Sequence, residues 1–310
     1  MDIYKRLEHE YAAFTGSKYA VSCNSGTSAL HLALLAVGIG KEDEVIVPDF
    51  TMAACGFAVA YTGAKVVTVD CGDDLNIDVL KIEEKITPKT KAIMAVHIYG
   101  RLCHMDEIMR IARKYNLKVI EDAAEAQGAV MNSEADITCY SLYRNKIINA
   151  EEGGICTTNN KKYVERMNYL KNMAFGNKHD YFHEEIGYNY RMPNAQAKLA
   201  LKSLRNFHKE KIQRRKAEGR LIAIDNMPVR AAVWVFDLDL GEKRDEIKQK
   251  IEKQGIATRY FFKPLSTFPM FKQQVGKNAL EWSKRGLYLP NFKTLTKEEI
   301  KFLEQVCVIS

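Results

Sequence analysis

Short apolar runs alternate with amphipathic stretches through the first half of the chain. Apolar residues recur at helical spacing over residues 28–37, 77–84 and 105–115, which predicts a helix at each place. Strands that alternate with helices form βαβ units, so we expect an α/β fold with a largely parallel sheet covered on both faces. The runs rich in β-branched residues predict the strands, at residues 19–23, 44–47, 65–69, 92–96, 118–121, 137–141 and 154–158.

The pattern changes after Asn194, where a longer amphipathic stretch places apolar residues on one face and many cations on the other. We expect this stretch to form a helix that connects two domains. Beyond it, the pattern predicts a strand at residues 231–240 and a helix at residues 243–254. The chain is therefore expected to form a large α/β domain that includes the connecting helix, residues 1–215, and a smaller α+β domain, residues 216–310.

The composition is that of an ordinary globular protein, with 46% hydrophobic and 27% charged residues. No apolar run approaches the roughly 20 residues that a membrane-spanning helix needs. The opening residues carry charges throughout and lack the apolar centre of a signal peptide. We therefore expect a cytoplasmic protein that has no membrane partner.

Charge and cysteine content narrow the possible partners. The net charge of +7 is spread along helical stretches, which favours solvated helix faces and equally suits a small anionic ligand such as a nucleotide diphosphate. We expect no nucleic-acid partner, because the cations do not gather in one block. The seven cysteines lack CxxC spacing, which favours reduced core residues over a disulfide framework or a metal site.

A cluster of small and hydroxyl residues, Gly26, Thr27 and Ser28, follows a predicted strand and opens a predicted helix. Backbone amides can approach an anion closely there, the hydroxyls can donate to it, and the helix dipole favours negative charge. A phosphate group would fit this place. The alternative is a plain N-cap of the helix, which the sequence favours slightly more when this cluster is taken alone.

Asp122 lies at the carboxyl end of another predicted strand. Open parallel sheets bind ligands beyond the carboxyl ends of their strands, so this carboxylate is positioned to point into a crevice. It could hold a pyridine nitrogen in the protonated state, which makes the ring a sink for electrons. An aspartate that caps the following segment is an equally good interpretation.

A third segment carries a lysine in a polar loop. Lys146 follows the strand predicted at residues 137–141, and the pair Gly153 and Gly154 allows an unusual backbone path before the next strand. A lone loop lysine is usually a surface residue. The three segments occur together, however, each beside a strand end, and this favours a reactive lysine whose lowered pKa lets it attack a carbonyl carbon.

From about Arg6 to Leu201, and more loosely to the end, the chain resembles the DegT/DnrJ/EryC1/StrS family of sugar aminotransferases. That resemblance implies a fold-type I enzyme, with a mostly parallel seven-stranded sheet, helices on both faces and a smaller C-terminal α+β domain. It also implies the cofactor pyridoxal 5'-phosphate (PLP), which becomes pyridoxamine phosphate during turnover. The matching segments are NSGTSALHLALLAVGIGKEDEVIVPDFT, AYTGAKVVTVD, ITPKTKAIMAVHIYG, VIEDAAEAQGA, SLYRNK with EEGG, and GYNYRMPNAQA.

The resemblance assigns roles to individual residues. It implies that Lys146 forms the Schiff base with PLP, that Asp122 pairs with the pyridine nitrogen and that Glu125 lies near the phenolic oxygen. Asn189 resembles an asparagine that reaches the phosphate of the partner subunit, which implies a homodimer with shared active sites. The remaining cofactor-binding candidates are the phosphate ligands Thr27, Ser28 and Ser141, with Gly26 beside them, and Met52, which stands where the family usually has an aromatic residue against the ring. His183 is a candidate for substrate contact, although an exposed loop histidine is at least as good an interpretation.

The resemblance also implies a reaction with two halves. Glutamate, the expected donor, gives its amino group to the cofactor, and a nucleotide-linked keto sugar then takes it. The GYNYRMPN segment is similar to members that act at C4 of a 4-keto-6-deoxy sugar, as in perosamine or viosamine formation; C3 amination and the nucleotide stay open. Met52 and a short segment at residues 129–135 favour one alternative, a binding or regulatory protein without turnover. A related dehydratase would carry histidine at the lysine position, so Lys146 argues against it.

Overall fold

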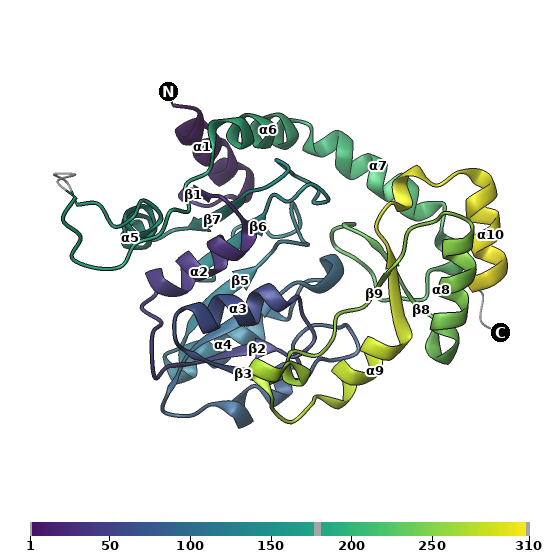
Figure 1. The fold of residues 1–310 in the computed structure, drawn as a ribbon, viewed down its shortest axis with the longest axis horizontal. Coiled ribbons are helices and arrows are strands. Elements are labelled where there is room, and N and C mark those ends of the chain that lie inside the picture. Colours follow the sequence, from purple (N-terminus) through teal and green to yellow (C-terminus); the bar gives the residue numbers. More distant parts are fainter. Residues whose placement is uncertain (1, 177–180, 308–310) are drawn as a thin grey trace.

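A computed structural model describes residues 2–176 and 181–307, and its main feature is one seven-stranded sheet (Figure 1). Strand β7 runs antiparallel to its neighbours β1 and β6, and the other neighbouring strands are parallel. This confirms the predicted α/β fold with a mostly parallel sheet. In sheet order the strands are β1 (Tyr19–Cys23), β7 (Gly154–Thr158), β6 (Ile137–Ser141), β5 (Lys118–Asp122), β4 (Thr90–Val96), β2 (Glu44–Pro48) and β3 (Lys65–Val69).

Helices cover both faces of this sheet because its side chains alternate between apolar cores on the two faces. In β2, Val45 and Val47 pack into one core and Ile46 packs into another. Both faces are thereby buried, as a parallel sheet requires. On the side of Val45 lie α2 (Gly26–Ala36), α3 (Ala53–Tyr61) and α5 (Lys161–Lys171); on the other side lie α1 (Ile3–Thr15), α4 (Met105–Tyr115) and α6 (Asn194–Arg205).

The prediction of a helix at residues 77–84 is wrong. Two short 3₁₀ turns, Val79–Lys81 and Glu83–Lys85, occupy this region instead. The Asp78 carboxylate accepts from the Leu80 N–H and starts the first turn, while the Leu80 side chain is 85% exposed. Because Leu80 does not join a buried face, the segment lacks the continuous apolar stripe that would hold a helix against the sheet.

Two further elements differ from the prediction. The connecting stretch forms two helices, α6 and α7 (Phe207–Gly219), which meet at Asn206; the Asn206 side chain donates to the Lys202 carbonyl at the end of α6. The strand predicted at residues 231–240 is shorter, because only β8 (Phe236–Asp239) pairs with a neighbouring strand. Before β8 the chain is irregular.

The C-terminal part builds a second, three-stranded antiparallel sheet, in the order β8, β10 (Gly286–Leu289) and β9 (Arg259–Tyr260). Residues of α7, α8 (Arg244–Lys253) and α10 (Lys297–Cys307) share one apolar core with it. A domain boundary at residue 216 would fall inside α7 and stays a prediction. No helix in the described ranges is long and apolar enough to cross a membrane.

The segment before α9 (Lys277–Arg285) returns to the large sheet, where it runs past β3 (Figure 1). The buried Asp49 carboxylate, which follows β2, accepts from the Ser266 N–H and hydroxyl, both at 2.8 Å, and from the Gly276 N–H at 2.9 Å. Asp70, which follows β3, accepts from the Ala279 N–H at 2.9 Å, near the start of α9. These contacts fasten the C-terminal part to the edge of the sheet that holds the site.

Candidate active site

A cavity of about 350 Å³ opens where β4, β5 and β6 end, beside the start of α2. Its volume lies in the range of small-molecule sites, and it occupies the edge at which open parallel sheets bind ligands. Side chains from the C-terminal part close one side of it. It brings together most of the residues singled out from the sequence: Gly26, Thr27, Met52, Asp122, Glu125, Ser141 and Lys146.

The Lys146 side chain is buried and lines this cavity. Glu125 Oε1 lies 3.8 Å from Lys146 Nζ, and the centroid of the Trp234 ring lies 3.6 Å from the same atom. Burial lowers the pKa of the Lys146 amine, while the neighbouring carboxylates of Glu125 and Asp122 oppose this shift. A larger share of the amine is therefore neutral, and able to act as a nucleophile, than at an exposed lysine.

Gln127 fixes the loop that carries Lys146. Its Nε2 donates to the carbonyls of Ser141 and Ile148, at 2.9 and 3.0 Å, and its Oε1 accepts from the Ile148 N–H at 2.7 Å. Within the loop, the Lys146 N–H donates to the Tyr143 carbonyl at 2.8 Å. Because these bonds hold the backbone on both sides of Lys146, the lysine projects from a fixed turn and not from a free surface loop.

Asp122 ends β5 and is buried, with a hydrogen-bond donor on each carboxylate oxygen. Oδ1 accepts from the Ala124 N–H at 2.9 Å, and Oδ2 accepts from the Cys55 thiol at 3.3 Å. Burial raises the pKa of the Asp122 carboxyl, while the Ala124 amide, the Cys55 thiol and the Lys146 amine act in the opposite direction. The carboxylate is thereby oriented at the cavity wall, where it can meet a protonated ring nitrogen.

Glu125 is buried between Lys146 and a strained turn after β4. Its Oε2 accepts from the Tyr99 N–H at 2.8 Å. Tyr99 has φ 50° and ψ 32°, a left-handed conformation that is costly for a residue with a side chain. Burial raises the pKa of Glu125 to about 7, against the effect of the Lys146 amine and the Tyr99 amide. Glu125 can therefore gain or lose a proton near neutral pH.

The first turn of α2 lines the cavity at the place where we expect an anion to bind. A Cβ on Gly26 would lie 2.8 Å from the Ser141 Cβ, so the helix start packs directly on the end of β6. Ser28 does not line the cavity: its N–H donates to Ser25 Oγ at 3.1 Å, and the two hydroxyl oxygens lie 2.9 Å apart. Ser28 thus serves the N-cap that the sequence offered as an alternative, while Thr27 and Ser141 face the cavity.

The structure places two other candidates away from the cavity. His183 is exposed, and its Nδ1 lies 2.7 Å from the Met173 carbonyl oxygen. Asn189 is also exposed, and its carbonyl accepts from the Asn24 side chain at 3.4 Å, just before the start of α2. A substrate contact by His183 and a reach to a partner subunit by Asn189 both stay predictions.

Comparison with known proteins decides the family. The family model described as "DegT/DnrJ/EryC1/StrS aminotransferase family" matches residues 2–307. The chain belongs to this family. It is 37% identical to GDP-perosamine synthase of Caulobacter vibrioides over 95% of this chain and 86% of that protein. It is 36% identical to GDP-perosamine synthase of Escherichia coli O157:H7 over 96% of this chain and 87% of that protein.

Solved structures agree with this assignment and with the predicted fold class. The crystal structure of S. venezuelae DesV in complex with a ketimine intermediate covers 99% of this chain and 88% of its own, at 30% identity and a TM-score of 0.89. The resemblance found in the sequence is therefore confirmed at the level of family and fold. In a DegT/DnrJ/EryC1/StrS member, the cavity at the sheet edge is the candidate active site.

The donor set of this family member fits PLP. A buried amine at Lys146 can bond to an aldehyde, and the oriented carboxylate of Asp122 can hold a protonated pyridine nitrogen. The start of α2, with Thr27 and Ser141 beside it, offers amides and hydroxyls to a phosphate group. The side chain of Met52 is 53% exposed at the start of α3 and lines the cavity, where it can lie against a ring face.

Sequence reasoning missed three aromatic residues that close the far side of the cavity: Trp234, Phe262 and Tyr288. They come from the C-terminal part, where the resemblance to the family is looser and assigned them no role. Tyr99 links them, with ring centroids 6.2 Å from Trp234 and 5.1 Å from Phe262. Sequence reasoning also missed Cys55, which donates to Asp122, and Gln127, which holds the lysine loop. Gln127 stands in the matching segment VIEDAAEAQGA, which gave it no role in holding the loop.

Proposed function

We propose that this family member is a PLP-dependent aminotransferase that moves an amino group from glutamate to C4 of a nucleotide-linked 4-keto-6-deoxy sugar. The observation that carries this proposal is the buried amine of Lys146, which shares one cavity with the carboxylates of Asp122 and Glu125. The substrate class is supported by relatives named GDP-perosamine synthase in two organisms.

PLP, when bound, supplies an aldehyde that takes up the amino group and a ring that stabilises negative charge beside it. The residues of the chain supply proton transfer and positioning. Asp122 would keep the ring nitrogen protonated, since its Oδ2 and Oδ1 are already held by the Cys55 thiol and the Ala124 amide. Thr27, Ser141 and the first amides of α2 would hold the phosphate.

Lys146 would carry the proton between the substrate carbon and the cofactor. Its burial favours the neutral amine, which is the form that removes a proton. Glu125 Oε1, at 3.8 Å, lies close enough to stabilise the ammonium form that results. The aromatic wall of Trp234, Phe262 and Tyr288 keeps bulk water from this side of the cavity.

The proposal includes a homodimer, in which Asn189 reaches the phosphate in the partner's site. Asn189 is exposed and adjoins Asn24, close to the phosphate end of the cavity. An exposed polar side chain at this place can donate a hydrogen bond to a phosphate bound by a second copy of the chain. Sedimentation velocity tests the dimer, and an Asn189→Ala variant should lower PLP affinity while the sedimentation coefficient stays unchanged.

The decisive experiment locates the amine that bonds to PLP. The purified protein is mixed with PLP and reduced with borohydride, and its peptides are analysed by mass spectrometry. We expect the reduced cofactor on Lys146 and on no other lysine. Lys146→Met should abolish both trapping and amino transfer, whereas the control Lys171→Met, which removes another poorly exposed lysine that pairs with Glu8, should retain both. Trapping on a different lysine would overturn the assignment.

The substrate is tested with ¹⁵N-labelled glutamate and a panel of nucleotide-linked 4-keto and 3-keto sugars. We expect ¹⁵N in the amino group of a 4-amino-4,6-dideoxy sugar. Transfer to a 3-keto sugar alone would contradict the C4 assignment, although the aminotransferase assignment would stand. A cofactor absorbance that glutamate cannot change would contradict the transaminase itself and favour a binding or regulatory protein.

A further inference from the structure

Trp234 contacts the lysine loop with both parts of its side chain. The face of its ring lies 3.6 Å from Lys146 Nζ, and its indole N–H donates to the Asn145 carbonyl at 3.1 Å. Trp234 is buried, with 4% of its surface exposed. An ammonium group over an indole face is attracted by the negative face of the ring. One side chain therefore holds both the amine of Lys146 and the backbone beside it.

The chain that carries Trp234 is held in an irregular path. The carbonyls of Val233 and Trp234 accept from Arg214 Nη1, at 3.3 and 2.6 Å, and so they do not need a neighbouring strand. The Ala232 N–H donates to the Gly100 carbonyl at 3.0 Å. Gly100 has φ 80°, and a Cβ there would lie 1.9 Å from the Ala232 oxygen. Only glycine permits this close approach between the turn after β4 and the segment before β8.

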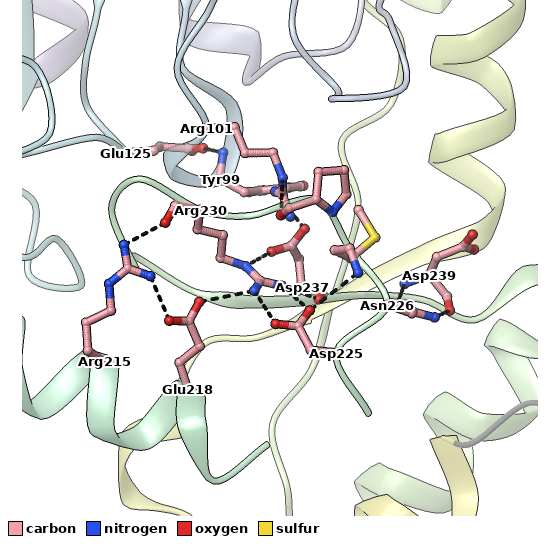
Figure 2. A network of polar contacts seen from close by, with 12 residues as sticks. Tyr99, Arg101, Glu125, Arg215, Glu218, Asp225, Asn226, Arg230, Asp237 and Asp239 are labelled. Carbon is pink, nitrogen blue, oxygen red and sulfur yellow. Dashed lines mark hydrogen bonds and ion pairs between the residues drawn. The ribbon is translucent and has the colours of Figure 1, made fainter. Parts of the chain in front are cut away.

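A buried network of charges fixes the same segment on its other side (Figure 2). Arg101 Nη1 lies 2.9 Å from Asp237 Oδ2, and both side chains are at most 3% exposed. Asp237 also accepts from Arg230, which pairs in turn with Asp225 at 2.8 Å. Asp237 is in β8, three residues after Trp234, whereas Arg101 follows the strained turn at Tyr99 whose N–H donates to Glu125.

We propose that Trp234 is a positioning residue for Lys146, and that the Arg101–Asp237 ion pair sets the place of Trp234. The role of Lys146 in chemistry rests on the proposed function. The contact itself does not, and it is measured on the full chain before PLP is added. The failure of this proposal can therefore be distinguished from the failure of the proposed function, because Trp234 can contact Lys146 even in a protein whose Lys146 never traps PLP.

The first test uses Trp234 as its own reporter. The chain has two tryptophans, so Trp282→Phe leaves Trp234 alone. We expect the emission intensity of Trp234 in this background to change with pH as the nearby amine gains or loses its proton. Adding Lys146→Met should abolish that change. The same pH profile with and without Lys146 would overturn the proposed contact.

The second test measures the reactivity of the Lys146 amine. Trace acetic anhydride is applied across a pH range, and acetylation of Lys146 is quantified by mass spectrometry. Trp234→Leu removes the ring face that favours the ammonium form, so the midpoint should move to lower pH by about 0.5–1.5 units. Trp234→Phe keeps a ring face and should stay close to the parent protein, as should Trp282→Leu. Equal shifts in the Leu and Phe variants of Trp234, or no shift in either, would contradict the proposal.

The third test addresses the ion pair. In the Trp282→Phe background, Arg101→Leu should move the emission maximum of Trp234 and shift the Lys146 midpoint in the direction seen for Trp234→Leu. The matched control is Arg285→Leu, which removes an exposed arginine whose Nε lies 3.0 Å from Asp239 at the other end of β8. Arg101→Leu and Arg285→Leu variants that behave alike would show that the buried pair does not position Trp234. The first test does not depend on either variant.

Discussion

The thiol of Cys55, in α3, donates to Asp122 Oδ2 at the end of β5 over 3.3 Å. The Thr51 hydroxyl lies 3.3 Å from the same sulfur. A buried carboxylate without its donors would rotate more freely and take up a proton more easily. Cys55 therefore helps Asp122 to stay ionised and oriented, although the two residues come from different elements.

Replacing Cys55 tests this relationship. Cys55→Val keeps the shape but removes the donor, at a cost of about 1 kcal/mol to the ionised carboxylate, so PLP should bind about fivefold more weakly. Cys55→Ser keeps a donor and should stay within about twofold of the parent protein. Absorbance titration with PLP gives the affinities. Cys71→Val, at a buried cysteine that does not line the cavity, is the control. Equal affinities for Cys55→Val and Cys55→Ser would contradict the prediction.

A pH-dependent loss of stability follows from His31 in α2. Its Nδ1 lies 3.2 Å from the Tyr190 hydroxyl, and burial lowers its pKa from 6.5 to about 4. The folded state thus binds a proton less tightly than the unfolded chain. The contribution of His31 to stability is full above pH 6.5 and is lost as pH falls toward 4. Between pH 7 and pH 4.5 this loss amounts to about 2 kcal/mol.

His31→Gln should remove that dependence. We expect the free energy of unfolding in urea to fall by about 2 kcal/mol less for this variant than for the parent protein between pH 7 and pH 4.5. His9→Gln, at an exposed histidine of α1, serves as the control and should follow the parent protein. A His31→Gln variant that loses as much stability on acidification as the parent protein would assign the acid sensitivity to other groups.

Glu151 stores backbone strain beside the active site. It has φ 65°, a left-handed conformation that costs a non-glycine residue about 1–2 kcal/mol, and its side chain is exposed. Glu151→Gly should therefore raise the free energy of unfolding by about 0.5–1 kcal/mol, after the entropy that glycine adds to the unfolded chain. Glu152→Gly, at the exposed neighbour without a positive φ, should be neutral or destabilising. Urea unfolding at one pH compares the two variants.

The large sheet could be predicted because its strands are short, apolar and separated by clear turns. The phosphate, ring-nitrogen and lysine candidates could be placed together, since Asp122 and Ser141 end parallel strands and such ends share one edge. The helix at residues 77–84 was wrong, because spacing cannot show that Leu80 points into solvent. His183 lies near a family segment in sequence but outside the cavity in space.

Residues that hold the site in place from distant parts of the chain show no local sequence pattern. Trp234 donates to the Asn145 carbonyl across 89 residues of sequence, and an irregular segment held by Arg214 presents it. The apolar residues at 231–236 and the alternation after them predict a strand throughout residues 231–240. The carbonyls of Val233 and Trp234 before β8 instead accept from the Arg214 side chain. Periodicity reports which faces are buried, and it carries no information about which distant side chain supplies a hydrogen bond.

Met52 offers the cofactor a flexible thioether where the family usually has an aromatic ring. Its side chain is 53% exposed at the start of α3 and lines the cavity. A rigid ring stacks on a pyridine face with less loss of conformational freedom than an unbranched thioether, and the gain is about 1 kcal/mol. Met52→Phe should therefore bind PLP about fivefold more tightly. Met131→Phe, at an exposed methionine outside the cavity, should leave the affinity unchanged. Weaker binding by Met52→Phe would mean that the thioether fits this cavity better than a ring does.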